Sequence, residues 1–390
     1  MAKTSLIINA TVITAAADRG LCGIYINEEG RVADIFKMED YDASRYPKAS
    51  ELLDASGNLV CSGLIDTHIH GIGGFSTDQA EASSILGMSE RLASFGVTSF
   101  IPTLYAGSPD KMEKEIKAVV SAMGKEKGAR ILGVNLEGPF LSPKKCGAQD
   151  SRSLTLPDVD VAKRLFDAAQ GKALAMTMAP ELEGSSDVAA LAAQYGVVLL
   201  MGHTSATYEQ ALMGIKMGFG HVTHMFNAMT SFFHKAPGVA GAAMMDDRLK
   251  CEIIADGVHV HKDVVKHVIK TKPRDNVVLI TDSLGPASLG PGRYVANGED
   301  VVLGEEGAFV DANDHSKLCG SALTLNKAVS NVVSWGVDLP QAVKMATENP
   351  AKIYGLKELG NISKGCLADI VILDSAFNAK DVYIGGKKIR

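Results

Sequence analysis

The stretch Gly63-Leu64-Ile65-Asp66-Thr67-His68-Ile69-His70-Gly71 decides how this chain is built. An apolar run ends in the pattern Asp-x-His-x-His, and a glycine follows at once. Residues two apart in a β-strand point to the same side, so His68 and His70 would project together from the end of one strand. Two imidazoles held in this way are a preorganised pair for a divalent metal ion. Histidines number only 10 among 390 residues, so this spacing is unusual for the composition.

Short apolar runs alternate with amphipathic, helix-like stretches from this point onward. Eight strand–helix repeats are typical of a (β/α)8 TIM-type barrel, so we predict an α/β fold of this kind. An open doubly wound sheet would need a glycine-rich phosphate loop after its first strand, and no G-x-G-x-x-G sequence opens a helix here. The eight runs span residues 64–66, 98–103, 131–136, 174–178, 197–201, 220–223, 252–255 and 277–281.

The two ends of the chain have a different pattern, because both are rich in strand-like segments. A turn at residues 27–30 predicts a hairpin near the N-terminus, and residues 366–373 form a buried strand near the C-terminus. We therefore expect a small β-sandwich domain built from both termini, residues 1–57 and 356–390, packed on a barrel of residues 58–355. A glycine-rich excursion with two short strands follows the eighth barrel strand, and Asn349-Pro350 predicts the end of a helix.

Composition limits the classes of function. Hydrophobic residues make up 46% of the chain and charged residues 22%, which describes a soluble globular protein. The formal charge of −6 argues against nucleic acid or an anionic membrane as a partner. Neither a signal peptide nor an apolar run of transmembrane length is recognisable. Six cysteines without CxxC spacing indicate reduced thiols, so we expect a cytoplasmic protein.

Polar residues stand at the carboxyl ends of the predicted strands, where barrels of this kind place their active sites. One such residue alone could simply cap the following helix. Several of them on one face are costly unless they are paired or bound to metal. The residues in question are His68, His70, Glu137, His203, His224, His259 and Asp282.

Glu137, His203 and His224 form a two-histidine, one-carboxylate set with open positions, which is typical of catalytic zinc or iron. Manganese or cobalt could use the same ligands. His68 and His70 could hold a second ion, bridged by a carboxylate, so one or two divalent ions are expected. A metal ion makes bound water acidic, and a carboxylate beside it can take the proton; we assign that role to Asp282. No competing nucleophile motif is present.

A second cluster follows the sixth strand, with Asn227 and Ala228 and then His234 and Lys235. Together with His259 it would bring basic and amide groups to the same mouth of the barrel. In a chain of negative net charge, such a cluster predicts where a phosphate group would bind.

These motifs carry a resemblance. D-x-H-x-H, L-E-G-P-F, G-H-T, H-x-F-N-A-M, D-G-V-H, T-D-S and G-x-L-A-D-I-V-I-L-D appear in the order found in the amidohydrolase superfamily. L-E-G-P-F and H-x-F-N-A-M resemble more narrowly the branch that deacetylates N-acetyl amino-sugar phosphates. The likeness runs from about Asp54 to Leu373.

The resemblance implies a metal-dependent hydrolase that removes the acetyl group of N-acetylglucosamine 6-phosphate by metal-activated water, giving glucosamine 6-phosphate and acetate. It implies Glu137, His203 and His224 as ligands of the principal metal and Asp282 as the acid/base. It also implies a homodimer.

For the substrate, the resemblance implies contacts from Asn227, Ala228 and His259 and places Gln149 near the acetamide. Lys235 stands where the family often has an arginine that reaches the phosphate in the neighbouring subunit. Lysine keeps that charge without the bidentate fork, and His234 lies beside it.

Three alternatives stay open at this stage. The galactosamine epimer of the substrate differs at one hydroxyl, and motifs do not separate the two sugars. A cyclic amidase often uses a carbamylated lysine as metal bridge, whereas Glu137 ends the third strand here. A non-catalytic barrel scaffold would usually have lost its metal ligands.

Overall fold

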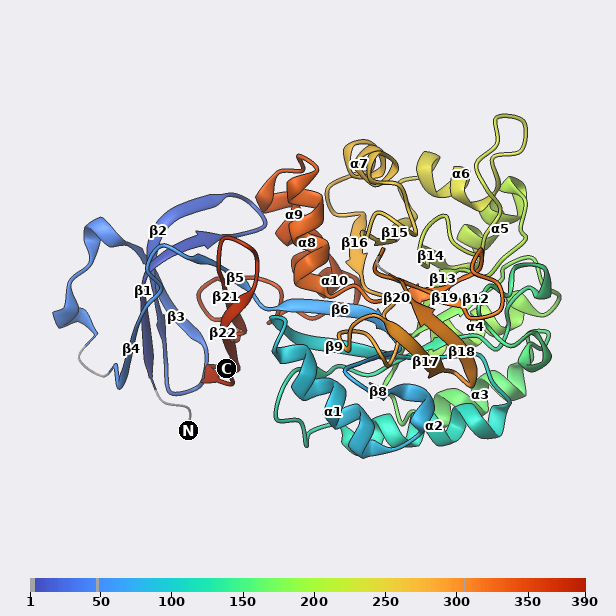
Figure 1. Ribbon diagram of the computed structural model, residues 1–390, viewed down its shortest axis with the longest axis horizontal. Helices are drawn as coiled ribbons and strands as arrows, with labels where there is room; N and C mark the ends of the chain where they lie inside the picture. Colours follow the sequence, from blue (N-terminus) through green and yellow to red (C-terminus); the bar gives the residue numbers. More distant parts are fainter. Residues whose placement is uncertain (1–3, 47–48, 305) are drawn as a thin grey trace.

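The computed structural model describes residues 4–46, 49–304 and 306–390. Residues 1–3, 47–48 and 305, which fall within the expected domains, lie outside this description. Figure 1 shows two bodies side by side, a sheet built from both chain ends and a barrel wrapped by helices. Strand β6 (Leu64–Ile69) leads from the sheet into the barrel. The Asp-x-His-x-His stretch therefore lies at the first strand of the barrel.

The predicted (β/α)8 barrel is confirmed. Parallel pairing runs in the order β6, β9, β11, β12, β13, β14, β15 and β16. The third predicted run is divided in two, because a short strand β10 (Arg130–Ile131) pairs with β9 before β11 begins. The other strands are β9 (Val97–Leu104), β11 (Val134–Glu137), β12 (Ala173–Met178), β13 (Val198–Met201), β14 (Phe219–Val222), β15 (Lys250–Ile254) and β16 (Val277–Ile280).

The first and last barrel strands are joined by the side chain of Asp66 and by backbone hydrogen bonds just beyond it, among them those from the His70 and Gly71 amides to the carbonyl of Ser283. The Thr281 hydroxyl donates to Asp66 Oδ2 at 2.6 Å, and the Thr281 amide donates to Asp66 Oδ1 at 3.3 Å. Just beyond, the Asp282 amide donates to the carbonyl of His68 at 2.9 Å. Asp66 therefore closes the barrel and fixes the loop that carries Asp282.

Helices cover the outside of the barrel, and their ends follow from local sequence. Helix α5 begins with a capping box between Thr207 and Gln210 and ends at Gly218, whose φ of 107° suits glycine. No helix in the described part of the chain is long and apolar enough to cross a membrane. The helices are α1 (Ala82–Ala93), α2 (Pro109–Ala122), α3 (Val159–Ala168), α4 (Ser185–Tyr195), α5 (Tyr208–Met217), α6 (Gly238–Met245), α7 (Lys262–Thr271), α8 (Leu325–Ser334), α9 (Leu339–Met345) and α10 (Glu348–Ile353).

Two helical segments differ from expectation. The predicted stop at Asn349-Pro350 is wrong, because α9 already ends at Met345 and Pro350 lies near the start of α10. Proline is tolerated there since the first amides of a helix have no intrahelical partner. Helix α6 was not expected, because its sequence GVAGAAMM has no polar face to mark a helical period.

The sheet from the two termini joins segments far apart in sequence. Strand β1 pairs with β2 on one edge and, on the other, with β4 over its first half and β5 over its second. A buried cluster with members from both chain ends lies within this body. Its strands are β1 (Ser5–Ile13), β2 (Asp18–Ile26), β3 (Val32–Lys37), β4 (Glu51–Asp54), β5 (Leu59–Ser62), β21 (Ile370–Leu373), β22 (Ala379–Ile384) and β23 (Lys387–Lys388).

The excursion after the eighth barrel strand is a four-stranded antiparallel sheet rather than two short strands. Two of its strands were expected, β18 (Glu299–Leu303) and β19 (Ala308–Asp311), and β17 (Gly292–Ala296) and β20 (Leu318–Ser321) flank them. The Ser321 amide donates to the carbonyl of Asp282 at 3.0 Å. The excursion sheet is thus attached to the loop that carries the predicted acid/base.

Candidate active site

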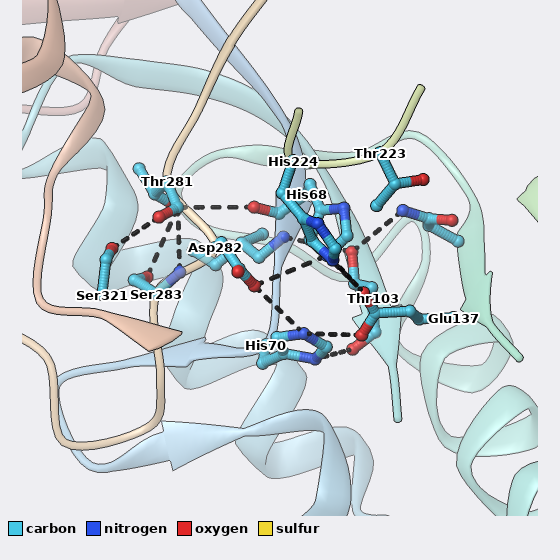
Figure 2. Close-up of polar contacts among 12 residues, drawn as sticks. His68, His70, Thr103, Glu137, Thr223, His224, Thr281, Asp282, Ser283 and Ser321 are labelled. Atoms are coloured by element: carbon cyan, nitrogen blue, oxygen red, sulfur yellow. Dashed lines mark hydrogen bonds and ion pairs between the residues drawn. The ribbon is translucent and has the colours of Figure 1, made fainter. Parts of the chain in front are cut away.

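Six ionisable side chains predicted from the strand ends meet at one end of the barrel. Figure 2 shows five of them, with His70, Asp282 and Glu137 directed toward one another beneath His68 and His224. His68 lies on β6, His70 is the residue immediately after it, and Glu137 is the last residue of β11. The remaining three follow their strands directly: His203 after β13, His224 after β14 and Asp282 after β16.

The first group consists of Glu137, His203 and His224, all buried. Glu137 Oε1 lies 3.1 Å from His203 Nε2 and 3.0 Å from His224 Nε2. The two imidazole nitrogens are themselves 3.1 Å apart. Three potential ligand atoms therefore converge on one point, as the sequence predicted.

The second group consists of His68, His70 and Asp282. Asp282 Oδ1 lies 3.3 Å from His70 Nε2 and 3.5 Å from His68 Nε2. Glu137 faces this group too, with Oε2 at 3.3 Å from His70 Nε2 and Oε1 at 3.5 Å from His68 Nε2. One carboxylate thus stands between both groups, which is the geometry of a bridging ligand.

The two carboxylates of the cluster, Glu137 and Asp282, favour positive charge on the groups around them. Burial lowers the pKa of His68, but the nearby carboxylates, Glu137 first among them, outweigh burial and raise that pKa to about 10. Burial raises the pKa of Glu137, but the charge of His203 and hydrogen bonds from both histidines of the first group hold it well below its ordinary value. Two buried carboxylates among imidazoles are stable only beside cations, either protonated rings or metal ions.

The donor set fits a divalent metal ion. His68 Nε2 is buried, lies on the side of the ring that faces both carboxylates, and has no hydrogen-bond partner. A buried polar atom without a partner costs free energy, and a cation at this point would supply the partner. Two imidazoles and a carboxylate with an open position are what catalytic zinc uses.

Backbone conformation also marks the site. His203, His224 and Asp282 all adopt positive φ, at 47°, 29° and 50°. This left-handed region is unfavourable for residues with a side chain, and such strain tends to gather at functional sites. Here it turns three side chains from the ends of their strands toward one centre.

The orientation of the rings is set by their second nitrogen. His70 Nδ1 lies 3.0 Å from the carbonyl of Thr103, and His203 Nδ1 lies 3.1 Å from the carbonyl of Cys146. Each carbonyl accepts a hydrogen bond from Nδ1–H, which leaves the lone pair of Nε2 free to bind a cation. Tyr105 adds a stacked contact with the His70 ring, at 3.8 Å between centroids and 9° between planes.

A pocket opens directly onto this cluster. Gln149, expected near the acetamide, is one of its walls: its Nε2 donates to Glu137, and its Oε1 accepts from the Ala106 amide at 3.0 Å. Asn227 and Ala228 also line the pocket. His259 does as well, with Nδ1 2.6 Å from Asp256 Oδ2.

Two expected substrate contacts are not brought to this pocket. His234 and Lys235 are exposed on the loop before α6, beside the exposed rings of Phe232 and Phe233. Neither is among the described residues that line the pocket of their own chain. His221 is also outside the pocket: it is buried in β14, where burial lowers its pKa to about 3.

Sequence reasoning missed several residues of the site. Tyr105 and the β20 residue Cys319 line the pocket, and Glu252 Oε2 lies 3.2 Å from His68 Nδ1. Glu252 did carry a signal, because it is a single carboxylate within the otherwise apolar run of β15 and needed a partner inside the barrel.

Fold and site together define a barrel of the hydrolase class with two groups of side chains that could hold metal ions. The model of the amidohydrolase family matches residues 59–389, and the chain belongs to this family.

Its relatives narrow the class. The chain is 30% identical to N-acetylglucosamine-6-phosphate deacetylase of Lysinibacillus sphaericus, over 95% of this chain and 94% of the relative. It is also 30% identical to N-acetylgalactosamine-6-phosphate deacetylase of Escherichia coli O157:H7, over 87% and 90%. Among solved structures, a mutant N-acetyl-D-glucosamine-6-phosphate deacetylase of Mycobacterium smegmatis in complex with N-acetyl-D-glucosamine-6-phosphate has a TM-score of 0.91 at 28% identity, with 99% of each chain covered.

Proposed function

We propose that this protein is a metal-dependent hydrolase that converts N-acetylglucosamine 6-phosphate to glucosamine 6-phosphate and acetate. The observation that carries the proposal is the convergence of two ligand groups on Glu137, beside a pocket that Asp282 also lines. The relatives and solved structures whose names include this activity support the choice of substrate.

The principal metal ion would be held by Glu137, His203 and His224, and a second by His68 and His70 with Asp282 or Glu137. Zinc or iron suits these ligands best, and manganese or cobalt can also use them. When bound, such an ion lowers the pKa of water to about 7 and polarises a carbonyl oxygen.

Asp282 is the proposed acid/base. Burial raises its pKa, but the hydrogen bond with His70 and the charges of the nearby imidazoles hold the pKa below its ordinary value. The carboxylate is therefore ionised at neutral pH and ready to accept a proton. It would take one from the attacking water and give it to the amine nitrogen as the C–N bond breaks.

Gln149 and the phosphate contacts would orient the substrate. We propose that Gln149, held between Glu137 and the Ala106 amide, lies against the acetamide. Asn227, Ala228 and His259 would face the sugar phosphate.

We propose that His234 and Lys235 act on the neighbouring subunit of a homodimer, because their loop is exposed. Phe232 and Phe233 support this arrangement: they are 52% and 54% exposed on the same loop, and apolar rings of that size usually become buried at an interface.

We also propose that residues 1–57 with 356–390 form one domain and residues 58–355 the other. The pairing of β5 with β1 supports one refinement, in which the terminal domain extends through Ser62. The six free cysteines support the proposed cytoplasmic location.

N-acetylgalactosamine 6-phosphate is a second candidate substrate, favoured by the Escherichia coli relative of that name. Acetate release should be measured on both sugar phosphates, with and without a chelator. We expect the higher kcat/KM on the glucosamine compound and loss of turnover on chelation. Turnover on neither sugar phosphate with metal bound would refute the proposal.

A further inference from the structure

The four histidines of the site differ in the hydrogen-bond partner of Nδ1, the ring nitrogen that faces away from the carboxylate Glu137. His70 and His203 face backbone carbonyls, and His224 Nδ1 is buried without a partner. His68 alone of the four faces a carboxylate, with Nδ1 at 3.2 Å from Glu252 Oε2. Its opposite nitrogen, Nε2, is the buried atom that faces Glu137 and Asp282 without a hydrogen-bond partner.

Glu252 is placed to act on His68 and not on the substrate. It lies on β15, is 3% exposed and is not among the described residues that line the pocket. Burying a carboxylate is expensive unless a charged or hydrogen-bonding partner compensates it. The contact with His68 provides that compensation, so the buried carboxylate of Glu252 is stabilised by the imidazole that it orients.

A carboxylate at Nδ1 has a defined effect on a metal-binding imidazole. It accepts a hydrogen bond from Nδ1–H, which keeps the proton on Nδ1 and leaves a lone pair on Nε2. It also makes Nε2 a stronger metal ligand than a carbonyl partner at Nδ1 does. His68 should therefore be the strongest imidazole donor in the site.

We propose that Glu252 is a positioning residue that makes His68 the anchor of the second cation group, with His70 and Asp282. This inference rests on the proposed metal-dependent function, because it concerns the same centre. The inference predicts that Glu252 raises the affinity of the group of His68, His70 and Asp282 for a divalent ion. The affinity of the group of Glu137, His203 and His224 should not depend on Glu252.

The test is metal binding by the full chain carrying Glu252→Gln. Glutamine is nearly isosteric, but it has no charge and can turn its amide N–H toward Nδ1, which would place the ring proton on Nε2 where a cation must bind. Protein stripped of metal is titrated with zinc against a competing chelator, and bound zinc per chain is measured. The visible absorption of bound cobalt gives an independent reading of each site.

We expect two binding steps in the wild type. Glu252→Gln should weaken one step by about 10- to 100-fold and leave the other unchanged. The weakened step should be the one that His70→Ala removes, and not the one that His203→Ala removes. Glu115→Gln is the matched control, because it replaces another buried acidic side chain, one whose ion-pair partner is Lys111 and not a histidine of the site, and it should change neither step. If Glu252→Gln fails to fold, Glu252→Asp keeps the charge, shortens the reach, and should weaken the same step.

The inference is overturned if both steps are the same in Glu252→Gln and wild type, if both weaken equally, or if the wild type binds a single ion. Acetate release by the wild type would still stand in each of those cases. Conversely, the wild type could bind two ions, with one step weakened by Glu252→Gln, and yet release no acetate. That result would refute the proposed function and leave this inference intact.

Discussion

Replacing Glu115 with glutamine should remove a pH-dependent loss of stability that this side chain imposes on the folded chain. Glu115 lies on α2 and is 1% exposed, and neither of its carboxylate oxygens has a hydrogen-bond partner. Its nearest cation is Lys111 Nζ at 3.6 Å, on a side chain that is 41% exposed. Burial therefore dominates and raises the pKa of Glu115 from 4.5 to about 7, although Lys111 opposes the shift.

The sign follows from which state holds the proton. Between pH 4.5 and about 7 the folded chain keeps the Glu115 proton while the unfolded chain has released it. The contribution of Glu115 to the free energy of unfolding is therefore fully present below its pKa in the unfolded chain. That contribution is lost as the pH rises through its pKa in the folded chain. The rise from 4.5 to about 7 corresponds to about 3 kcal/mol at about 1.36 kcal/mol per pKa unit.

Urea unfolding of wild type and Glu115→Gln at a series of pH values, with equal metal loading, measures this difference. The free energy of unfolding of the variant minus that of the wild type should grow by about 3 kcal/mol between about pH 4.5 and pH 8. Glu113→Gln is the control on the same helix, because hydrogen bonds with Lys117 and Arg164 hold the pKa of Glu113 below its ordinary value. That variant should show no such gain. A difference that stays flat with pH for Glu115→Gln would refute the reasoning.

Three further predictions concern the site and the strand that supports it. Asp282→Asn should lower kcat by about 10²- to 10⁴-fold, and unchanged bound metal would show that proton transfer is what was lost. Chelation should abolish acetate release and lower the melting temperature, and both should return with added zinc; stability unaffected by chelation would argue against ions bound in the folded state. Asp66→Ala should cost about 1–3 kcal/mol in urea unfolding, because it removes the buried acceptor of the 2.6 Å hydrogen bond from the Thr281 hydroxyl; an unchanged unfolding midpoint would contradict this role.

Much of the site could be predicted because parallel strands bring their carboxyl ends to one face. His68 and Glu137 lie on strands whose apolar pattern is plain in the sequence, and His70, His203, His224 and Asp282 follow such strands within two residues. Once eight repeats indicate a closed barrel, these positions must be neighbours without any knowledge of side-chain geometry.

The unpredicted parts depend on contacts that no local pattern encodes. Strands β17 and β20 form because they pair with β18 and β19 in the excursion sheet. Such pairing depends on tertiary context more than on the hydrophobic pattern of the strand itself. Tyr105 immediately follows β9 and stacks on the His70 ring, but an aromatic residue at a strand end carries no signal of a site as a histidine or a carboxylate does. The left-handed backbone at His203, His224 and Asp282 has no signal in residue type, since none of these residues is glycine.

The first residue of the Asp-x-His-x-His stretch shows how one strand organises both halves of the proposed chemistry. Asp66 belongs to neither candidate ligand group, yet its carboxylate accepts from Thr281, the residue before Asp282. The same strand presents His70 Nε2, 3.3 Å from Asp282 Oδ1. The Asp66–Thr281 hydrogen bond, together with the backbone bond from the Asp282 amide to the His68 carbonyl, therefore fixes Asp282 relative to His70. Asp66→Ala should disturb turnover more than it disturbs the principal metal group of Glu137.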